Sequence, residues 1–162
     1  MTGSWQAGVL GGVVGALAMG GLMLATNEPT LAVAIPSLYA LAPPPNVAAG
    51  LFVHLSQGAV LGVGFAALVG VLELNSTGKL LAGGIAWGVV TWAVFAALVM
   101  PLWLPAVGSP ASPPFPNFAV PSLLWHVVYG VVLGGVYAAT VERLLTTPPY
   151  SLPRALRRSV TP

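Results

Sequence analysis

The sequence has no cysteine and very few charged residues, and each absence excludes a class of protein. Without cysteine there is no disulfide, no thiolate chemistry and no Cys-ligated zinc or iron–sulfur centre. Only 5% of the 162 residues are charged and 57% are hydrophobic, with a mean hydropathy of +0.92. This composition is too apolar to cover a water-soluble globule, and five basic residues are too few for a nucleic-acid-binding surface. The chain is therefore predicted to have the lipid bilayer, and no nucleic acid, as its partner.

The sequence also lacks the motifs of common enzyme active sites. It contains no G-x-S-x-G, no phosphate-binding loop, no His-Glu-x-x-His and no carboxylate dyad. Its many glycines lie inside apolar runs, where the usual role of glycine is to let two helices approach closely. We therefore expect a protein without catalytic residues that is not an enzyme.

Four apolar stretches are long enough to cross a membrane. A hydrocarbon core about 30 Å thick requires roughly 20 helical residues. The predicted helices cover residues 5–25, 47–74, 80–100 and 121–145. The first could instead be a cleaved signal peptide, but its start, MTGSWQ, carries no Lys or Arg, and residues 12–24 resemble residues 88–100. We expect all four stretches to be membrane-spanning helices.

The segments between these helices are of two kinds. A tight turn at residues 75–79 contains Asn, Ser and Gly, which predicts an antiparallel helical hairpin. The two longer connections, residues 27–46 and 101–122, contain many prolines and several aromatic residues, which suit loops at a membrane surface. The predicted fold is an all-α bundle of four transmembrane helices in residues 1–145, followed by a basic, proline-containing tail in residues 146–162.

One motif occurs twice in the chain, with a spacing of 72 residues. Residues 54–69 are HLSQGAVLGVGFAALV and residues 126–141 are HVVYGVVLGGVYAATV, and eight of the sixteen positions are identical. Chance would match roughly one position in seven in a chain of this composition. The internal repeat predicts two tandem helical hairpins of the same orientation, related by a pseudo-two-fold axis along the membrane normal.

The basic residues predict how the bundle is oriented. With four spans, both termini and the turn at residues 75–79 lie on one side of the membrane. All five basic residues fall on that side: Lys79, Arg143, Arg154, Arg157 and Arg158. Because Lys and Arg accumulate on the cytoplasmic side, these residues are predicted to lie at the inner membrane surface. The sequence thus predicts a multi-pass protein of the cell membrane with both termini in the cytoplasm.

Each copy of the motif places a histidine on the same helical face as a pair of glycines. Residues three or four apart share a face of a helix. The shared faces carry His54 with Gly58 and Gly62 in one copy, and His126 with Gly130 and Gly134 in the other. Glycines at this spacing favour close helix packing, and an ionisable side chain deep in a membrane avoids lipid. We expect these glycines to pack helices together and both imidazoles to point into the bundle.

Three interpretations of the histidines remain open. In the first, each is structural and bonds to a backbone carbonyl, to a hydroxyl such as that of Ser56 or Thr91, or to the other histidine. In the second, His54 and His126 ligate a b-type haem or a metal, which requires ring nitrogens about 4 Å apart across the metal. Contact between the two glycine pairs would leave no room for a porphyrin, and no Arg or Lys near the outer face could hold its propionates. In the third, the histidines serve a proton or solute path, although no other titratable group lies deep in a span.

The same residues carry a family resemblance. The chain resembles small, functionally uncharacterised four-helix membrane proteins of bacteria and halophilic archaea. The resemblance lies in the run H-x-x-x-G-x-x-L-G-x-x-[FY]-A, which begins at His54 and again at His126, and in G-x-x-x-W at Gly88–Trp92 with the following Met100–Pro101. The resemblance covers most of residues 5–145 and implies a fold and a membrane location. By analogy of class, we expect an accessory or structural subunit of a larger membrane complex, such as an electron-transport assembly, in contact with other subunits or with itself.

Overall fold

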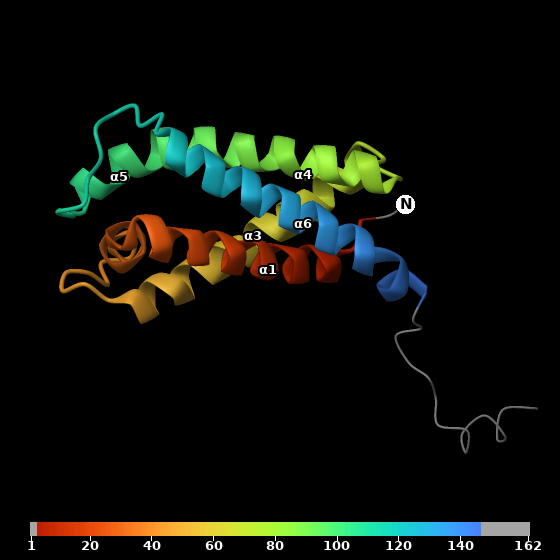
Figure 1. The fold of residues 1–162 in the computed structure, drawn as a ribbon, viewed down its shortest axis with the longest axis horizontal. Coiled ribbons are helices and arrows are strands. Elements are labelled where there is room, and N and C mark those ends of the chain that lie inside the picture. Colours follow the sequence, from red (N-terminus) through yellow and green to blue (C-terminus); the bar gives the residue numbers. More distant parts are fainter. Residues whose placement is uncertain (1–2, 147–162) are drawn as a thin grey trace, which may run out of the picture.

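The computed structural model describes residues 3–146, with side chains through residue 141, and in this part of the chain the regular elements are all helices joined by loops. The elements are α1 (Trp5–Thr26), the π-helix η1 (Thr30–Ala34), α2 (Ile35–Ser37), α3 (Val47–Val71), α4 (Thr77–Thr91), the π-helix η2 (Trp92–Val99), α5 (Met100–Ala106) and α6 (Val120–Thr146) (Figure 1). The segments long and apolar enough to cross a membrane are Trp5–Thr26, Val47–Val71, Thr77–Ala106 and Val120–Val141. The prediction of an all-α protein with four such helices is confirmed. Residues 147–162 of the predicted tail lie outside the described residues.

The turn between α3 and α4 starts earlier than its composition suggests. We expected the helix to continue to residue 74, but α3 ends at Val71 because Glu73 adopts a left-handed conformation with φ of 52°. The N–H of Leu74 then donates to the carbonyl of Val69 at 3.1 Å, which is the bond of a Schellman cap. Ser76 caps the next helix by accepting the N–H of Lys79 at 3.4 Å, so α4 begins at Thr77 instead of residue 80.

The third long helix continues through a proline that was expected to end it. We predicted a connection beginning at residue 101, whereas helical structure extends through η2 and α5 to Ala106. Pro101 has no N–H to donate to the carbonyl of Ala97, four residues earlier. That carbonyl instead accepts the backbone N–H of Asn117 at 2.9 Å. The connection before α6 therefore supplies the hydrogen bond that the proline removes.

The first half of the chain uses the same arrangement. Pro36 leaves the carbonyl of Ala32 without its helical donor, and the backbone N–H of Asn46 donates to this carbonyl at 2.8 Å. The side chain of Asn46 then caps α3 by accepting the N–H of Ala49 at 2.9 Å. In both halves, an asparagine that follows a proline ties the connection to the preceding helix.

The four long helices form two closely packed pairs. α1 packs against α3, and α4 packs against α6. α1 also packs against α6, which joins the pairs, whereas α3 and α4 contact each other little. Both longer connections lie at one end of the bundle, which we term the loop end (Figure 1). The start of α1, the turn between α3 and α4, and the end of α6 lie at the opposite end, the terminal end.

Glycines allow the backbones within each pair to touch. A Cβ atom on Gly12 of α1 would collide with the carbonyl oxygen of Gly58 of α3. A Cβ atom on Gly84 of α4 would likewise collide with the carbonyl oxygen of Gly130 of α6. The second contact is displaced from the first by 72 residues on both helices. Each histidine-bearing helix is therefore packed against the long helix that precedes it in the chain.

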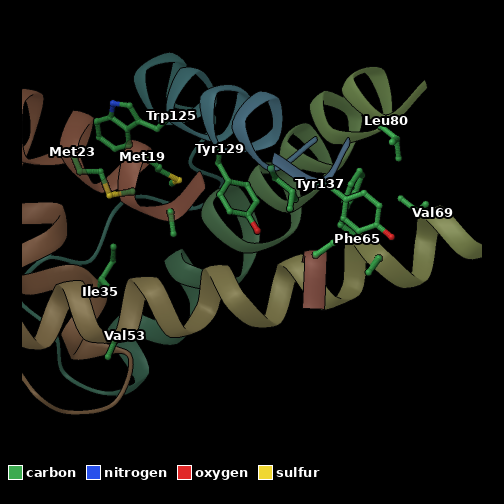
Figure 2. Close-up of a cluster of buried hydrophobic side chains, with 14 of the residues drawn as sticks. Met19, Met23, Ile35, Val53, Phe65, Val69, Leu80, Trp125, Tyr129 and Tyr137 are labelled. Atoms are coloured by element: carbon green, nitrogen blue, oxygen red, sulfur yellow. The ribbon is translucent and has the colours of Figure 1, made fainter. Parts of the chain in front are cut away.

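Large side chains fill the terminal half of the bundle. Phe65 of α3 and Tyr137 of α6 pack edge to face, with ring centroids 5.5 Å apart and planes at 87° (Figure 2). Leu133 and Val141 of α6 are fully buried in the same cluster. The hydroxyl of Tyr137 accepts the backbone N–H of Ser4 at 2.8 Å, which holds the start of α1 against α6. This half of the molecule is a packed core.

The two buried tyrosines of α6 provide a matched test of this core. Tyr137→Phe leaves the buried N–H of Ser4 without an acceptor, so we expect it to lower the free energy of unfolding by about 1–3 kcal/mol. Tyr129→Phe removes a donor to the carbonyl of Gly58 at 3.0 Å, but this carbonyl also accepts a helical bond from Gly62, so the loss should be about 1 kcal/mol or less. Unfolding by SDS titration in mixed micelles measures both. An equal or larger loss for Tyr129→Phe would contradict this account.

Candidate functional site

The loop half of the bundle contains a cavity of about 1240 Å³. Its wall is built from α1, the first connection, α3, the end of α4, the η2–α5 segment, the second connection and α6. Pockets that hold small molecules are typically about 300–1,000 Å³, so this cavity is large enough for a lipid-sized ligand. It lies between the two helical pairs, on the side where α3 and α4 contact each other little.

Hydrogen bonds between the two halves of the chain join the cavity walls at both ends. At the loop end, the indole N–H of Trp103 donates to the carbonyl of Leu38 at 3.0 Å. Toward the middle of the bundle, Tyr129 extends from α6 and its hydroxyl donates to the carbonyl of Gly58 in α3 (Figure 2). The core around Phe65 and Tyr137 follows directly beyond Tyr129. Tyr129 lines the cavity, whereas Phe65 and Tyr137 do not, so Tyr129 bounds the cavity toward the terminal end.

The side of the cavity is lined by exposed apolar side chains. Phe52 and Val60 of α3 line one edge and are each 71% exposed. Phe95 and Val99 of η2 line the opposite edge and are 45% and 44% exposed. These two walls do not pack closely on each other, so the cavity is open at the apolar surface between α3 and η2.

His54 is held by the helix that precedes it. It lies on α3, is only 6% exposed, and its Nε2 lies 3.1 Å from the carbonyl oxygen of Ala16 in α1. A carbonyl oxygen can only accept, so Nε2 carries the proton and donates it. In the neutral ring, Nδ1 is then unprotonated and offers a lone pair.

His126 uses its other nitrogen in the same way. It lies on α6 and is half-buried, and its Nδ1 lies 2.7 Å from the carbonyl oxygen of Ser122 in the preceding turn. Nδ1 is therefore the donor, and Nε2 offers the lone pair of the neutral ring. The hydroxyl of Ser122 accepts the indole N–H of Trp92 at 2.8 Å, which ties this turn to η2.

Both histidines line the cavity, and their unprotonated nitrogens are not sealed in the protein. Neither Nδ1 of His54 nor Nε2 of His126 bonds to another group among the described residues. Yet no fully buried side-chain nitrogen or oxygen in this part of the chain lacks a hydrogen-bond partner. Each of these two nitrogens therefore keeps some accessible surface, and both belong to residues that line the cavity.

The other predicted partners of the histidines bind elsewhere. Ser56 and Thr91 also line the cavity, but their hydroxyls donate to carbonyls of their own helices, those of Phe52 at 2.7 Å and Gly88 at 3.0 Å. No Asp, Glu, Lys or Arg lies among the lining residues that the structure describes. Residues 3–141 also contain no cluster of three or more His, Cys, Asp or Glu side chains that could hold a metal ion. The cavity is uncharged when its histidines are neutral.

The predicted helix-packing glycines do not meet one another across the bundle. Gly58 and Gly62 approach the backbone of α1, and Gly130 and Gly134 approach the backbone of α4. The glycines consequently draw the helices together within each pair and leave the space between the histidines open. This space is the cavity.

The predicted basic residues lie away from the cavity. Lys79 is exposed at the terminal end, where its Nζ donates to the side-chain oxygen of Asn75 at 3.2 Å. Arg143 belongs to the last turns of α6, and its side chain is not described. Arg154, Arg157 and Arg158 lie outside the described residues.

Several polar lining residues cannot be identified from the sequence as site residues, and two of them lie next to the histidines on the same helical faces. Tyr129 and Gln57 each lie three residues after a histidine, and both line the cavity. Residues three apart share a helical face, so H-x-x-Q-G and H-x-x-Y-G already place a second polar group beside each imidazole. That spacing was the available signal.

The fold and composition define a helical protein of membrane type whose loop half encloses an uncharged cavity with two histidines. A family model matches residues 3–147, and the chain belongs to this family, described as a family of unknown function (DUF6789). No curated protein and no solved structure shows a significant match to the chain. The family assignment agrees with the resemblance to uncharacterised proteins and carries no activity with it.

Proposed function

We propose that this protein is a non-enzymatic membrane protein that binds a neutral, amphipathic molecule in the cavity of its loop half. The observation that carries this proposal is the cavity itself, with about 1240 Å³ of space, a lining without Asp, Glu, Lys or Arg, and two lining histidines that each have one ring nitrogen unbonded among the described residues. A charged ligand would lose its hydration without gaining a partner of opposite charge. A neutral polar head group can bond to the imidazoles instead.

The lateral opening suits the apolar part of such a ligand. A tail that leaves the cavity between α3 and η2 would lie along Phe52, Val60, Phe95 and Val99, all of which are exposed. When no ligand is bound, these side chains would contact lipid. A ligand tail that replaces this lipid makes similar apolar contacts and so adds little to the binding free energy. The head group and its hydrogen bonds would then decide which ligand is selected.

We further propose that the two halves arose by duplication and that the loop end faces outward. The duplication is supported by the glycine contacts 72 residues apart and by the use of Asn46 and Asn117 to complete proline-containing helices in both halves. The orientation is supported by Lys79 and Arg143, which belong to the terminal end. With this orientation, the cavity lies in the outer leaflet of the cell membrane.

A second candidate function is that of an accessory subunit in a larger membrane complex, such as an electron-transport assembly. The opening between α3 and η2 supports it, because a ligand could pass sideways to an adjacent membrane protein. Purification in a mild detergent tests this role. A protein that co-elutes at a fixed stoichiometry supports it, and a monodisperse monomer contradicts it.

Haem or metal ligation by His54 and His126 is the alternative use of the cavity. Ligation through Nε2 of both rings would require His54 to give up its hydrogen bond to Ala16, while Nε2 of His126 is already free. An absorption spectrum with and without dithionite tests this alternative through the Soret band. A proton or solute path is a third alternative, but it would have to continue past Tyr129 into the packed core.

Filling the cavity tests the binding function. Ala96 of η2 lines the cavity and is buried, so Ala96→Trp places a large side chain in the ligand's space. We expect the amount of ligand recovered with the purified protein to fall by about tenfold, since overpacking a site costs about 1–3 kcal/mol. Solvent extraction and mass spectrometry measure the recovered ligand.

The control adds the same side chain outside the cavity. Ala86 of α4 is exposed and does not line the cavity, so Ala86→Trp should leave ligand recovery unchanged. If wild-type protein carries no stoichiometric ligand, or if Ala96→Trp folds and retains as much ligand as Ala86→Trp, the proposed function is wrong.

A further inference from the structure

Seven polar side chains of the cavity wall, including both histidines, share one property: each already donates its hydrogen to a backbone carbonyl of the protein. These side chains are His54, Ser56, Thr91, Trp103, Ser122, His126 and Tyr129. What remains on these side chains is mostly acceptor capacity, above all the lone pairs of the two imidazoles. A ligand that makes hydrogen bonds to the histidines must therefore bring its own donors.

The lining also favours a flat ring near these acceptors. Six aromatic side chains contribute to the wall: Tyr39, Phe52, Phe95, Trp103, Trp125 and Tyr129. Aromatic rings pack favourably against one another in stacked or edge-to-face arrangements. Two imidazole acceptors suit a head group with two donors, and the opening between α3 and η2 suits an apolar tail.

We propose that the cavity selects the reduced, dihydroxy form of a lipid-tailed quinone over its oxidised form. This inference rests on the proposed function and adds the chemical class of the ligand. The two hydroxyls of a hydroquinone donate to Nδ1 of His54 and Nε2 of His126. The oxidised quinone has two carbonyl oxygens, which can only accept, so they would face the same lone pairs without a hydrogen between them. Selective binding of the reduced form makes a bound quinone easier to reduce than a free one.

The test compares three probes with the same short alkyl tail: a hydroquinone, the corresponding quinone and an aliphatic alcohol. The full-length protein is used in detergent micelles under anaerobic conditions, and native mass spectrometry measures the binding of each probe. A buried polar group without its partner costs about 1–3 kcal/mol, so we expect the hydroquinone to bind about tenfold more tightly than the quinone, or better. The alcohol has one donor and no ring and should also bind more weakly than the hydroquinone.

Variants at His126 test whether its acceptor nitrogen causes the preference for the hydroquinone over the quinone. A glutamine amide both donates and accepts, so His126→Gln should bind the two redox forms almost equally while still binding the quinone. His126→Phe removes the acceptor and should weaken hydroquinone binding by about tenfold. Thr140→Ala is the control, because the hydroxyl of Thr140 donates to the carbonyl of Val136 in its own helix and the residue does not line the cavity. It should keep the wild-type preference.

The outcomes separate this inference from the proposed function. Equal or tighter binding of the quinone by the wild-type protein overturns the inference and leaves the proposed function standing. The same is true if the alcohol binds as tightly as the hydroquinone, or if His126→Gln keeps the full preference. If none of the probes binds although the purified protein carries another lipid, the ligand class is wrong. If none binds and no ligand is extracted, the proposed function fails as well.

Discussion

Gly12→Leu is expected to abolish the folded bundle, whereas Gly21→Leu, nine residues further along the same helix, is expected to be tolerated. A side chain at Gly12 would run into the backbone of Gly58 and Gly62, and neither can move without separating α1 from α3. Nothing lies within 4 Å of the position that a Cβ on Gly21 would occupy. Overpacking costs about 1–3 kcal/mol even where side chains can shift, and here only backbone could yield. The expected loss is therefore at the upper end of this range or beyond it.

The second helical pair provides an independent copy of the experiment. Gly84 meets the backbone of Gly130 and Gly134 in α6, so Gly84→Leu should be as damaging as Gly12→Leu. The yield of monodisperse protein on size-exclusion chromatography and the free energy of unfolding in mixed micelles measure each variant. A stable, monodisperse Gly12→Leu or Gly84→Leu protein would show that close backbone contact does not hold the pairs together.

The second large effect concerns orientation. The natural sequence has no cysteine, so single cysteines can be introduced without removing others. Ser112→Cys lies exposed in the second connection at the loop end, and Gly78→Cys lies at the start of α4 with open space around it. In intact cells, we expect a membrane-impermeant maleimide to label Ser112→Cys fully and Gly78→Cys only after the cells are opened. Lys79 and the other basic residues predict this result because they favour the cytoplasmic side. The reverse pattern would place the cavity in the inner leaflet.

The long helices were predictable because their signal is simple. A stretch of about 20 apolar residues forms a helix in lipid whatever its neighbours are, since every backbone hydrogen bond must be made internally. Helix ends were less predictable because they depend on individual contacts. Glu73 takes the left-handed position where glycine is usual, and the N–H of Asn117 compensates for Pro101. Neither effect can be recognised from the residue type at that position.

The candidate site was predictable only in part. The spacing of His54 and His126 from their glycines indicated that both imidazoles would point into the bundle. It could not show which helices the glycines approach, because Gly58 and Gly130 could have packed against each other as readily as against Gly12 and Gly84. That choice decides whether a cavity exists between the histidines. The protonated nitrogen of each ring likewise depends on which carbonyl lies nearest in the folded protein.

The central claim is that the loop half of this bundle holds a neutral amphipathic ligand between its two histidines. An experimental density map of the protein in lipid nanodiscs, at a resolution that distinguishes lipid from water, tests it most directly. The account predicts an elongated non-protein feature in the cavity, with its head within hydrogen-bond distance of Nε2 of His126 and its tail leaving between α3 and η2. A cavity that has collapsed, or one that contains only water, would contradict it.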